Sequence, residues 1–227
     1  MKNLKKMRMF LRVDNYERNK QEIDRGPYIK FEDMAIVCSI VVGFDNRGMI
    51  TIPVTWDLVK LYGLDIDMLF KKASVESEKH FPAKLVPMEE VIKDGIIEEM
   101  MENMRVSKDY AEREAESTYL KMFGVMPEDV PEIYVMTNNI KVLGASSVFY
   151  NMNLLRDMAI KKNCDLILLP SSVHEMLILP MEEDTNLEFF ESMVYDANMF
   201  VVENEDILSY CVFYYSLKEN TIKCFKR

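Results

Sequence analysis

Runs of apolar residues predict strands in the first quarter of the chain. The run 34–44 is almost unbroken and rich in Ile and Val, a pattern typical of a strand covered on both faces. Turn residues occupy 45–48, and a second apolar run at 49–54 completes a predicted β-hairpin. Ahead of this hairpin, shorter patterns indicate a strand at 8–13 and a helix at 16–23.

After this hairpin the pattern of apolar residues predicts helices. Thr55 is placed to cap a short helix at 56–62 that ends at Gly63. Asp65 is placed to cap a longer helix that reaches about Lys79. Apolar residues recur in this longer helix every three or four positions, which predicts one buried face.

A polar segment between residues 97 and 124 interrupts the pattern. It is rich in Glu and Met, favours helix and carries only a thin apolar stripe, so we expect a helical, acidic excursion at the surface. A connector with two prolines follows and predicts an internal boundary near 125–132. Apart from that boundary, we expect residues 1–227 to fold as a single domain.

The second half of the chain again alternates strands with helices. Strands are predicted at 133–137, 145–149, 166–169, 176–179, 210–215 and 221–225, and helices at 154–162 and 186–198. Strands joined by hairpins, with helices gathered between them, indicate the α+β class. We expect an antiparallel-rich sheet with helices packed mainly on one face.

Charge and apolar runs exclude several functions. The formal net charge is -10, and the segment from Glu182 to Asp206 contains acids and no Lys or Arg. Such a surface repels phosphate backbones, so we expect no nucleic-acid partner. The longest uncharged apolar run, 34–44, is shorter than the roughly 20 residues of a membrane helix, which indicates no membrane insertion.

The chain is expected to be cytoplasmic. Its basic start lacks the unbroken apolar stretch that follows in a signal peptide, because Arg12 and Asp14 interrupt it. The 4 cysteines are widely separated and form no C-x-x-C pair, which fits reduced thiols in a reducing compartment.

Three stretches of the chain carry a resemblance to a known family. They are residues 13–20 followed by 31–42, His80-Phe81-Pro82-Ala83 running on to 87–91, and the segment 169–176 with the sequence Leu-Pro-Ser-Ser-Val-His-Glu-Met. Together these stretches resemble domain-of-unknown-function family 5688 of gut Clostridia, over most of the chain. The resemblance implies a folded module and no particular activity.

The candidate catalytic residues are Ser171, Ser172, His174 and Glu175, which lie between two predicted strands. His174 could serve as a general base. On a strand Ser172 and His174 would share a face and form a hydroxyl–imidazole pair, whereas Glu175 would point to the opposite face. The alternative is a hairpin whose hydroxyls satisfy turn backbone groups and whose histidine is packed and hydrogen-bonded, and this interpretation is favoured.

The sequence indicates no metal and no cofactor. The two histidines, His80 and His174, and the scattered cysteines offer no ligand pair at short spacing. No calcium loop and no glycine-rich phosphate loop is present.

Two functional hypotheses of different classes follow. The first is a non-catalytic cytoplasmic module that binds a protein partner or a second copy of itself, with the acidic stretch holding Met100, Met101, Met104, Met122 and Met126 as its docking element. The alternative for these methionines is that they fill the core beneath a charged exterior, and this interpretation is favoured. The second is a small hydrolase or transferase centred on His174 with Ser172. The absence of catalytic motifs favours the first hypothesis, a protein that is not an enzyme.

Overall fold

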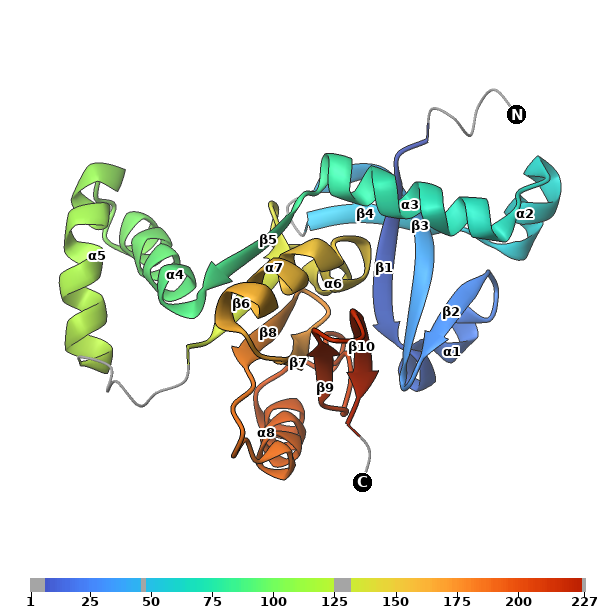
Figure 1. Ribbon diagram of the computed structural model, residues 1–227. Helices are drawn as coiled ribbons and strands as arrows, with labels where there is room; N and C mark the ends of the chain where they lie inside the picture. The colour runs from blue at the N-terminus through green and yellow to red at the C-terminus, as the bar shows by residue number, and fades with distance from the viewer. Residues whose placement is uncertain (1–6, 46–47, 125–131, 226–227) are drawn as a thin grey trace.

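The strands of the protein form two antiparallel sheets in a computed structural model that describes residues 7–45, 48–124 and 132–225 (Figure 1). In the first sheet the order is β1–β3–β2, and β4 also pairs with β3. Its strands are β1 (Met9–Asn15), β2 (Tyr28–Phe31), β3 (Met34–Asp45) and β4 (Gly48–Pro53).

The second sheet runs in the order β10–β9–β7–β8–β6–β5. Its strands are β5 (Ala83–Pro87), β6 (Tyr134–Asn138), β7 (Leu166–Ser172), β8 (Glu175–Pro180), β9 (Phe213–Ser216) and β10 (Thr221–Cys224). The helices around the two sheets are α1 (Tyr16–Ile23), α2 (Trp56–Tyr62), α3 (Ile66–His80), α4 (Met88–Asn103), α5 (Lys108–Phe123), the 3-10 helix η2 (Gly144–Ser146), α6 (Ser147–Tyr150), α7 (Met152–Lys162) and α8 (Leu187–Phe200).

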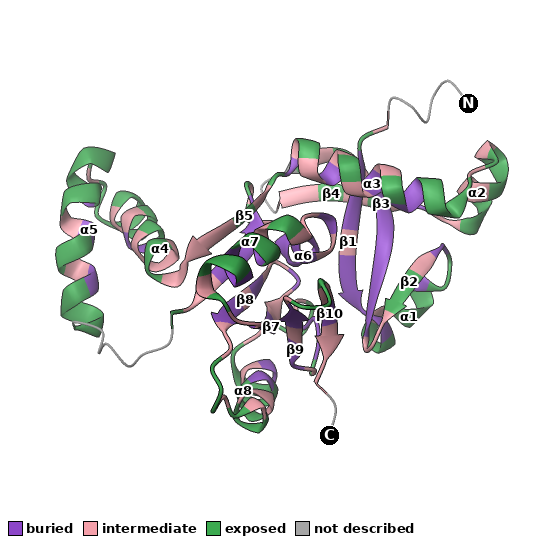
Figure 2. Cartoon of the chain, viewed as in Figure 1, coloured by how far each residue is buried: buried purple, intermediate pink, exposed green. Residues whose placement is uncertain are grey.

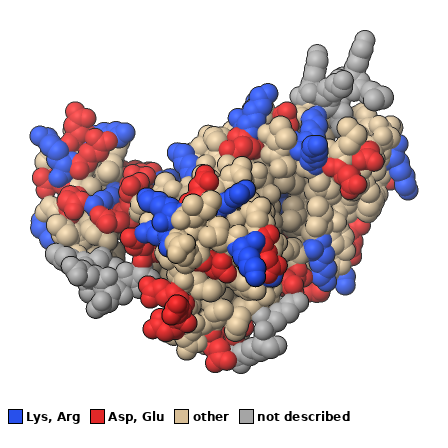
Figure 3. Space-filling view, in the orientation of Figure 1, with Lys and Arg blue, Asp and Glu red and all other residues tan. Residues whose placement is uncertain are grey.

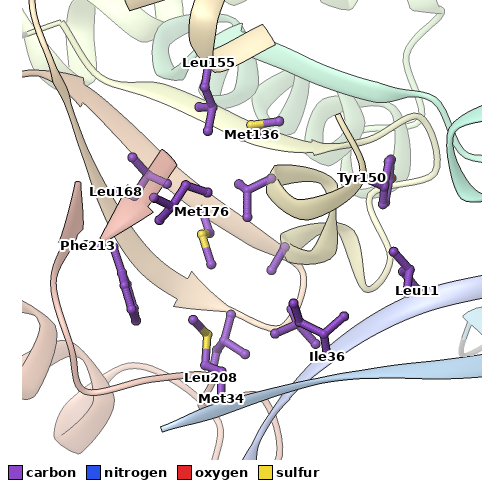
Figure 4. Close-up of a cluster of buried hydrophobic side chains, with 14 of the residues drawn as sticks. Leu11, Met34, Ile36, Met136, Tyr150, Leu155, Leu168, Met176, Leu208 and Phe213 are labelled. Carbon is purple, nitrogen blue, oxygen red and sulfur yellow. The ribbon is translucent and has the colours of Figure 1, made fainter. Parts of the chain in front are cut away.

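Both sheets contribute to the main hydrophobic core. Figure 4 shows side chains of the first sheet, such as Leu11 and Ile36, together with Met176 and Phe213 of the second sheet and Leu155 of α7. Each such side chain removed from water contributes about 1.5–3 kcal/mol to folding. The two sheets are therefore held together by burial, and we keep the prediction of a single domain over 1–227.

The connector between α8 and β9 ties the sheets together with polar contacts. Asp33, in the turn between β2 and β3, accepts hydrogen bonds from Ser209 Oγ at 2.6 Å and from the Tyr210 N–H at 2.9 Å. Asn15 Nδ2 donates to the Leu208 carbonyl at 3.1 Å. Hydrogen bonds to a charged carboxylate are among the stronger ones in proteins, so this connector is fixed rather than loose.

The α+β class and the antiparallel pairing predicted from the sequence are confirmed. Several local signals also hold, since Thr55 and Asp65 cap α2 and α3 and Gly63 ends α2 in the left-handed conformation. The strands β2 and β5 were not predicted, because both are short and only half-buried.

The sequence predicted an antiparallel-rich sheet with helices packed mainly on one face, and the structure adds detail to this arrangement. The structure has two sheets, and β7 of the second sheet is buried on both faces. Leu166 and Leu168 belong to the main core with residues of α7, whereas Ile167 and Leu169 pack with Val194 of α8. Successive residues of a strand point to opposite faces, so an apolar run without polar interruption requires cover on each side.

A correction concerns residues 145–149, which were expected to form a strand. They lie in η2 and α6 instead. Gly144 packs so closely that an added Cβ would lie 2.2 Å from Thr137 Oγ1 and 2.6 Å from the His174 carbonyl oxygen. A short apolar run does not by itself distinguish a strand from a buried helical turn, and this close approach selects the turn.

The helices α4 and α5 form an insertion within a β-hairpin. Pro87 at the end of β5 pairs with Tyr134 at the start of β6, and the Met88 N–H donates to the Ile133 carbonyl at 2.8 Å. The acidic excursion expected at 97–124 therefore belongs to a longer insertion, residues 88–133. Figure 1 shows its two helices projecting away from the sheets. The boundary expected near 125–132 falls mainly on residues 125–131, which lie outside the described residues.

Candidate functional site

The four candidate residues lie at the turn between β7 and β8. β7 continues past Pro170 to Ser172, with an irregularity in its pairing between these two residues, and β8 begins at Glu175. Val173 and His174 therefore form the turn itself. Two other segments lie against this turn, namely the loop 138–146 and the connector that contains Asp206.

Backbone hydrogen bonds fix the position of the turn. The Val173 N–H donates to the Asp206 carbonyl at 2.9 Å, and the Val173 carbonyl accepts from the Ala145 N–H at 3.2 Å. Thr137 Oγ1 donates to the His174 carbonyl at 2.8 Å. The turn is thus held from both sides by elements distant in sequence.

The loop 138–146 is shaped by Asn138. Its Oδ1 accepts from the Ile140 N–H at 3.0 Å and its Nδ2 donates to the Val142 carbonyl at 2.7 Å. Lys141 and Leu143 adopt positive φ values of 55° and 52°. Side chains with a Cβ seldom adopt this conformation, so the loop depends on the contacts made by Asn138 and His174 to hold it.

Both nitrogens of the His174 imidazole face a partner. Nδ1 accepts a hydrogen bond from the Leu143 N–H at 3.1 Å, and Nε2 lies 3.4 Å from Asp206 Oδ1. A nitrogen that accepts an N–H carries no proton, so the proton of the neutral ring is on Nε2 and points toward the carboxylate. The imidazole side chain is 39% exposed and bridges two loops near the surface.

The other candidates make local contacts. Ser172 Oγ accepts from the His174 backbone N–H at 3.1 Å, which is a turn contact and not the hydroxyl–imidazole pair that the sequence suggested. Ser171 Oγ donates to Glu175 Oε1 at 3.5 Å. In the part of the chain that the structure describes, the carboxylate recorded within 4.0 Å of the imidazole is that of Asp206.

Asp206 was missed by the sequence analysis. It lies far along the chain from His174, beyond the helix predicted at 186–198, and no spacing rule connects the two residues. The contact arises because the connector crosses the β7–β8 turn on its way to β9. Only the acidic character of 182–206 was visible in the sequence.

The Met-rich stretch lies mainly in the α4–α5 hairpin. Met100 packs against the small cluster formed by Ile96, Ala115 and Tyr119 between the two helices. Met101 and Met104 lie at the end of α4 and just after it, and both are exposed, as is Met122 in α5. Met126 lies outside the described residues.

Electrostatics link the two helices of the hairpin. Lys93 of α4 forms ion pairs with Glu89 and with Glu116 of α5, and its ammonium lies 5.1 Å from the centre of the Tyr119 ring. Its pKa is raised, first by the hydrogen bond with Glu116 and then by the bond with Glu89. The cation therefore stays charged at neutral pH and offsets part of the acidic charge between the helices.

Two other kinds of site, a metal cluster and a membrane-spanning helix, are absent from the residues that the structure describes. Within residues 7–45, 48–124 and 132–225, no group of three or more His, Cys, Asp or Glu side chains is placed to hold a metal ion. Among the helices of the same ranges, none combines the length and the apolar character that crossing a membrane requires.

Comparison with known proteins defines the family of the chain. No curated protein and no solved structure matches it significantly. The model of a family of unknown function, DUF5688, matches residues 2–217, which include every strand of both sheets except β10 and the whole α4–α5 insertion. The chain belongs to this family, DUF5688.

Proposed function

We propose that the protein is a non-catalytic, cytoplasmic interaction module whose α4–α5 hairpin docks a partner protein with a basic, partly apolar surface. The observation that carries this proposal is the insertion of the hairpin between β5 and β6, where a two-residue turn would connect the paired strands. A projecting insertion adds little to the main core, so its selective value is more readily explained by contacts with another molecule.

The surface of the hairpin supports this choice of partner. Residues 88–124 contain ten Asp and Glu against five Lys and Arg, which accounts for half of the net charge of the chain. Figure 2 shows that most of the hairpin is exposed, unlike the strands of the sheets. Met101, Met104 and Tyr110, which we call the hairpin tip, are 39%, 64% and 45% exposed. Methionine adapts its shape to a partner, and tyrosine is enriched in interfaces.

Paired variants test the role of the hairpin tip. The double variant Met101→Ser, Met104→Ser removes exposed apolar surface without touching the cluster around Ile96, and Leu61→Ser in α2, a residue 74% exposed, is the matched control. In tagged capture from the source cell's lysate with quantitative mass spectrometry, we expect one stoichiometric partner that the double variant loses and the control retains. A wild-type protein that stays monomeric and recovers no such partner would contradict the proposal.

Deletion of the hairpin gives a second test. Joining Met88 to Ile133 through Asn-Gly in place of residues 89–132 keeps the hydrogen bond between the two strands and supplies the residues of a tight hairpin turn. We expect this variant to fold, to retain its sheet signature by circular dichroism and to lose the partner. Retention of the partner would place the docking surface elsewhere.

A second candidate function is a small hydrolase or transferase centred on His174 with Ser172. The contact between the exposed imidazole and Asp206 favours it, because a carboxylate commonly orients a catalytic histidine. Against it, the Leu143 N–H occupies the nitrogen that a base would use. The variant His174→Asn keeps an acceptor for that N–H but no base. Hydrolysis of p-nitrophenyl esters or phosphates by the wild type that this variant abolishes would establish the enzyme.

The cytoplasmic location and the origin in gut Clostridia predicted from the sequence are parts of the proposal. Fractionation of source cells followed by immunoblotting tests the location, and a membrane-bound or secreted pool would contradict it.

A further inference from the structure

Helix α8 (Leu187–Phe200) carries apolar residues on more of its circumference than it buries. Its inner side packs Val194 against Ile167, Leu169 and Leu179 of the second sheet, with Leu187 and Phe190 beside them. Asn198, also buried, donates from Nδ2 to the Ser209 carbonyl at 2.8 Å. These contacts fix the helix on the sheet and determine which of its side chains face outward.

Three large apolar side chains form an exposed row along α8. They are Phe189, Met193 and Phe200, with exposed fractions of 58%, 46% and 82%. Intervals of four and seven residues place these side chains on one side of a helix, and we call this row the α8 stripe. A helix that is apolar on its inner side and on part of its outer side is typical of one covered by a further element.

The charge around the α8 stripe is of one sign. The segment Glu182–Asp206 contains nine Asp and Glu and no Lys or Arg, and Asp196 lies within the stripe between Met193 and Phe200. In Figure 3, acidic and uncharged surface is visible over the region of α8. A second copy of the chain, related by a two-fold axis, would place this acidic segment against itself and is disfavoured.

We propose that the α8 stripe docks an amphipathic helix of a partner protein, with apolar residues on one face and Lys or Arg on its flanks. Apolar residues at helical spacing would cover Phe189, Met193 and Phe200, and the flanking cations would pair with the surrounding carboxylates. This inference rests on the proposed interaction function but uses a surface separate from the hairpin tip, so each surface is tested without the other.

A defined probe tests the stripe. The probe is a fluorescein-labelled helical peptide of about three heptads, with Leu at the a and d positions and Lys at most others. Two control peptides have the same composition in scrambled order and Glu in place of Lys. Fluorescence anisotropy with the full chain measures binding at low and at physiological salt. We expect the Lys probe to bind more tightly than both controls and to weaken as salt rises.

Matched variants assign the binding to α8. The double variant Phe189→Ser, Phe200→Ser changes only exposed side chains, and we expect it to weaken the probe by about tenfold or more. The control Leu61→Ser should leave probe binding unchanged. The hairpin-tip variant Met101→Ser, Met104→Ser removes apolar residues from another acidic surface, so any loss of probe binding in it should be smaller than the loss in the α8 variant. Asp196→Lys should weaken binding and reduce its salt dependence.

Three outcomes overturn this inference. The first is equal binding of the scrambled or Glu peptide, and the second is no binding by the wild type. The third is a dimer in analytical ultracentrifugation that Phe189→Ser, Phe200→Ser converts to monomer, which would make the stripe a self-interface. Because the lysate capture depends on the hairpin tip and the probe on α8, failure of one experiment is distinguishable from failure of the other.

Discussion

Methionine and phenylalanine lie differently in the two-sheet body and in the α4–α5 hairpin. In the body, Met136 is 0% exposed and Phe213 is 1% exposed, whereas Met104 and Phe123 in the hairpin are 64% and 48% exposed. Figure 2 shows buried strands such as β1 and β3 in the body and mostly exposed helices in the hairpin. Met and Phe thus reach full burial at core positions of the body, although its surface helix α8 also exposes Phe200, whereas none of those described in the hairpin is completely buried.

The physical reason is the number of layers around each side chain. In the body two sheets and several helices enclose a residue from all directions. The hairpin offers only two helices, with a cluster built on Ile96, Ala115 and Tyr119, and two packed helices leave their outer faces in water. Composition therefore does not predict burial; the number of packed layers does.

The largest effect that separates the two regions is expected from one substitution made in both. Phe213→Ala should lower the free energy of unfolding by about 3–5 kcal/mol, because it leaves a cavity in the main core and removes the stacking on Phe31 at 5.4 Å. Phe123→Ala in the hairpin should cost less than about 1 kcal/mol. Urea denaturation measures both, and equal costs would contradict the comparison.

A smaller effect is expected from the polar contacts that hold the body together. His174→Ala leaves the Leu143 N–H without its acceptor and should cost about 1–3 kcal/mol. His174→Asn, which restores an acceptor, should recover part of that loss. Lys93→Gln in the hairpin removes exposed ion pairs and should cost at most about 1 kcal/mol. Thermal unfolding followed by circular dichroism compares the three variants, and a cost for His174→Ala no larger than that of Lys93→Gln would argue against a structural role of the imidazole.

A still smaller effect on global stability is expected from the core of the hairpin. Tyr119→Ala should open α4 and α5 locally while changing the global free energy of unfolding by less than about 0.5 kcal/mol, because α5 packs chiefly on α4. Hydrogen exchange should show loss of amide protection in α5 and unchanged protection in β7 and β8. Loss of protection in all three elements would mean that the hairpin and body unfold as one unit.

The smallest effect is expected in thiol labelling, where the buried thiol of Cys38 should not react with a disulfide reagent. Burial raises the pKa of Cys38 to about 12, so the thiolate required for attack is nearly absent at pH 8. The stability that this protonated thiol contributes is fully present below its ordinary pKa near 9.0 and is lost as pH rises toward 12.

The variant Met104→Cys places a thiol on the hairpin as a comparison. With a disulfide reagent at pH 8, we expect rapid reaction of the introduced thiol and none at Cys38, confirmed by peptide mapping.

Much of the secondary structure could be predicted from the sequence because its signals are local. α1 spans the predicted residues 16–23, and α2 has the predicted cap, length and terminating glycine. The hairpin of β3 and β4 follows from two apolar runs around turn residues. Capping, turn chemistry and periodicity act within a few residues, so a linear pattern contains them.

Only part of the candidate site could be predicted from the sequence, because its other contacts join segments that are distant along the chain. The sequence singled out His174 and its neighbours, because a histidine with hydroxyls and a carboxylate stands out between apolar strands. It missed Asp206 and Leu143, which supply the partners of the imidazole. These contacts depend on two loops that cross the β7–β8 turn, and no local rule places loops against each other.

By itself, the sequence determined the α+β class, the caps and ends of several helices, and the acidic character of the excursion and of the segment 182–206. Only the tertiary structure decided that there are two sheets, that the excursion is an insertion between paired strands, and that α8 leaves Phe189, Met193 and Phe200 in water. Local interactions fix an element within one stretch of chain. Which face of that element is buried depends on long-range packing, which the chain reaches only when its distant parts come together.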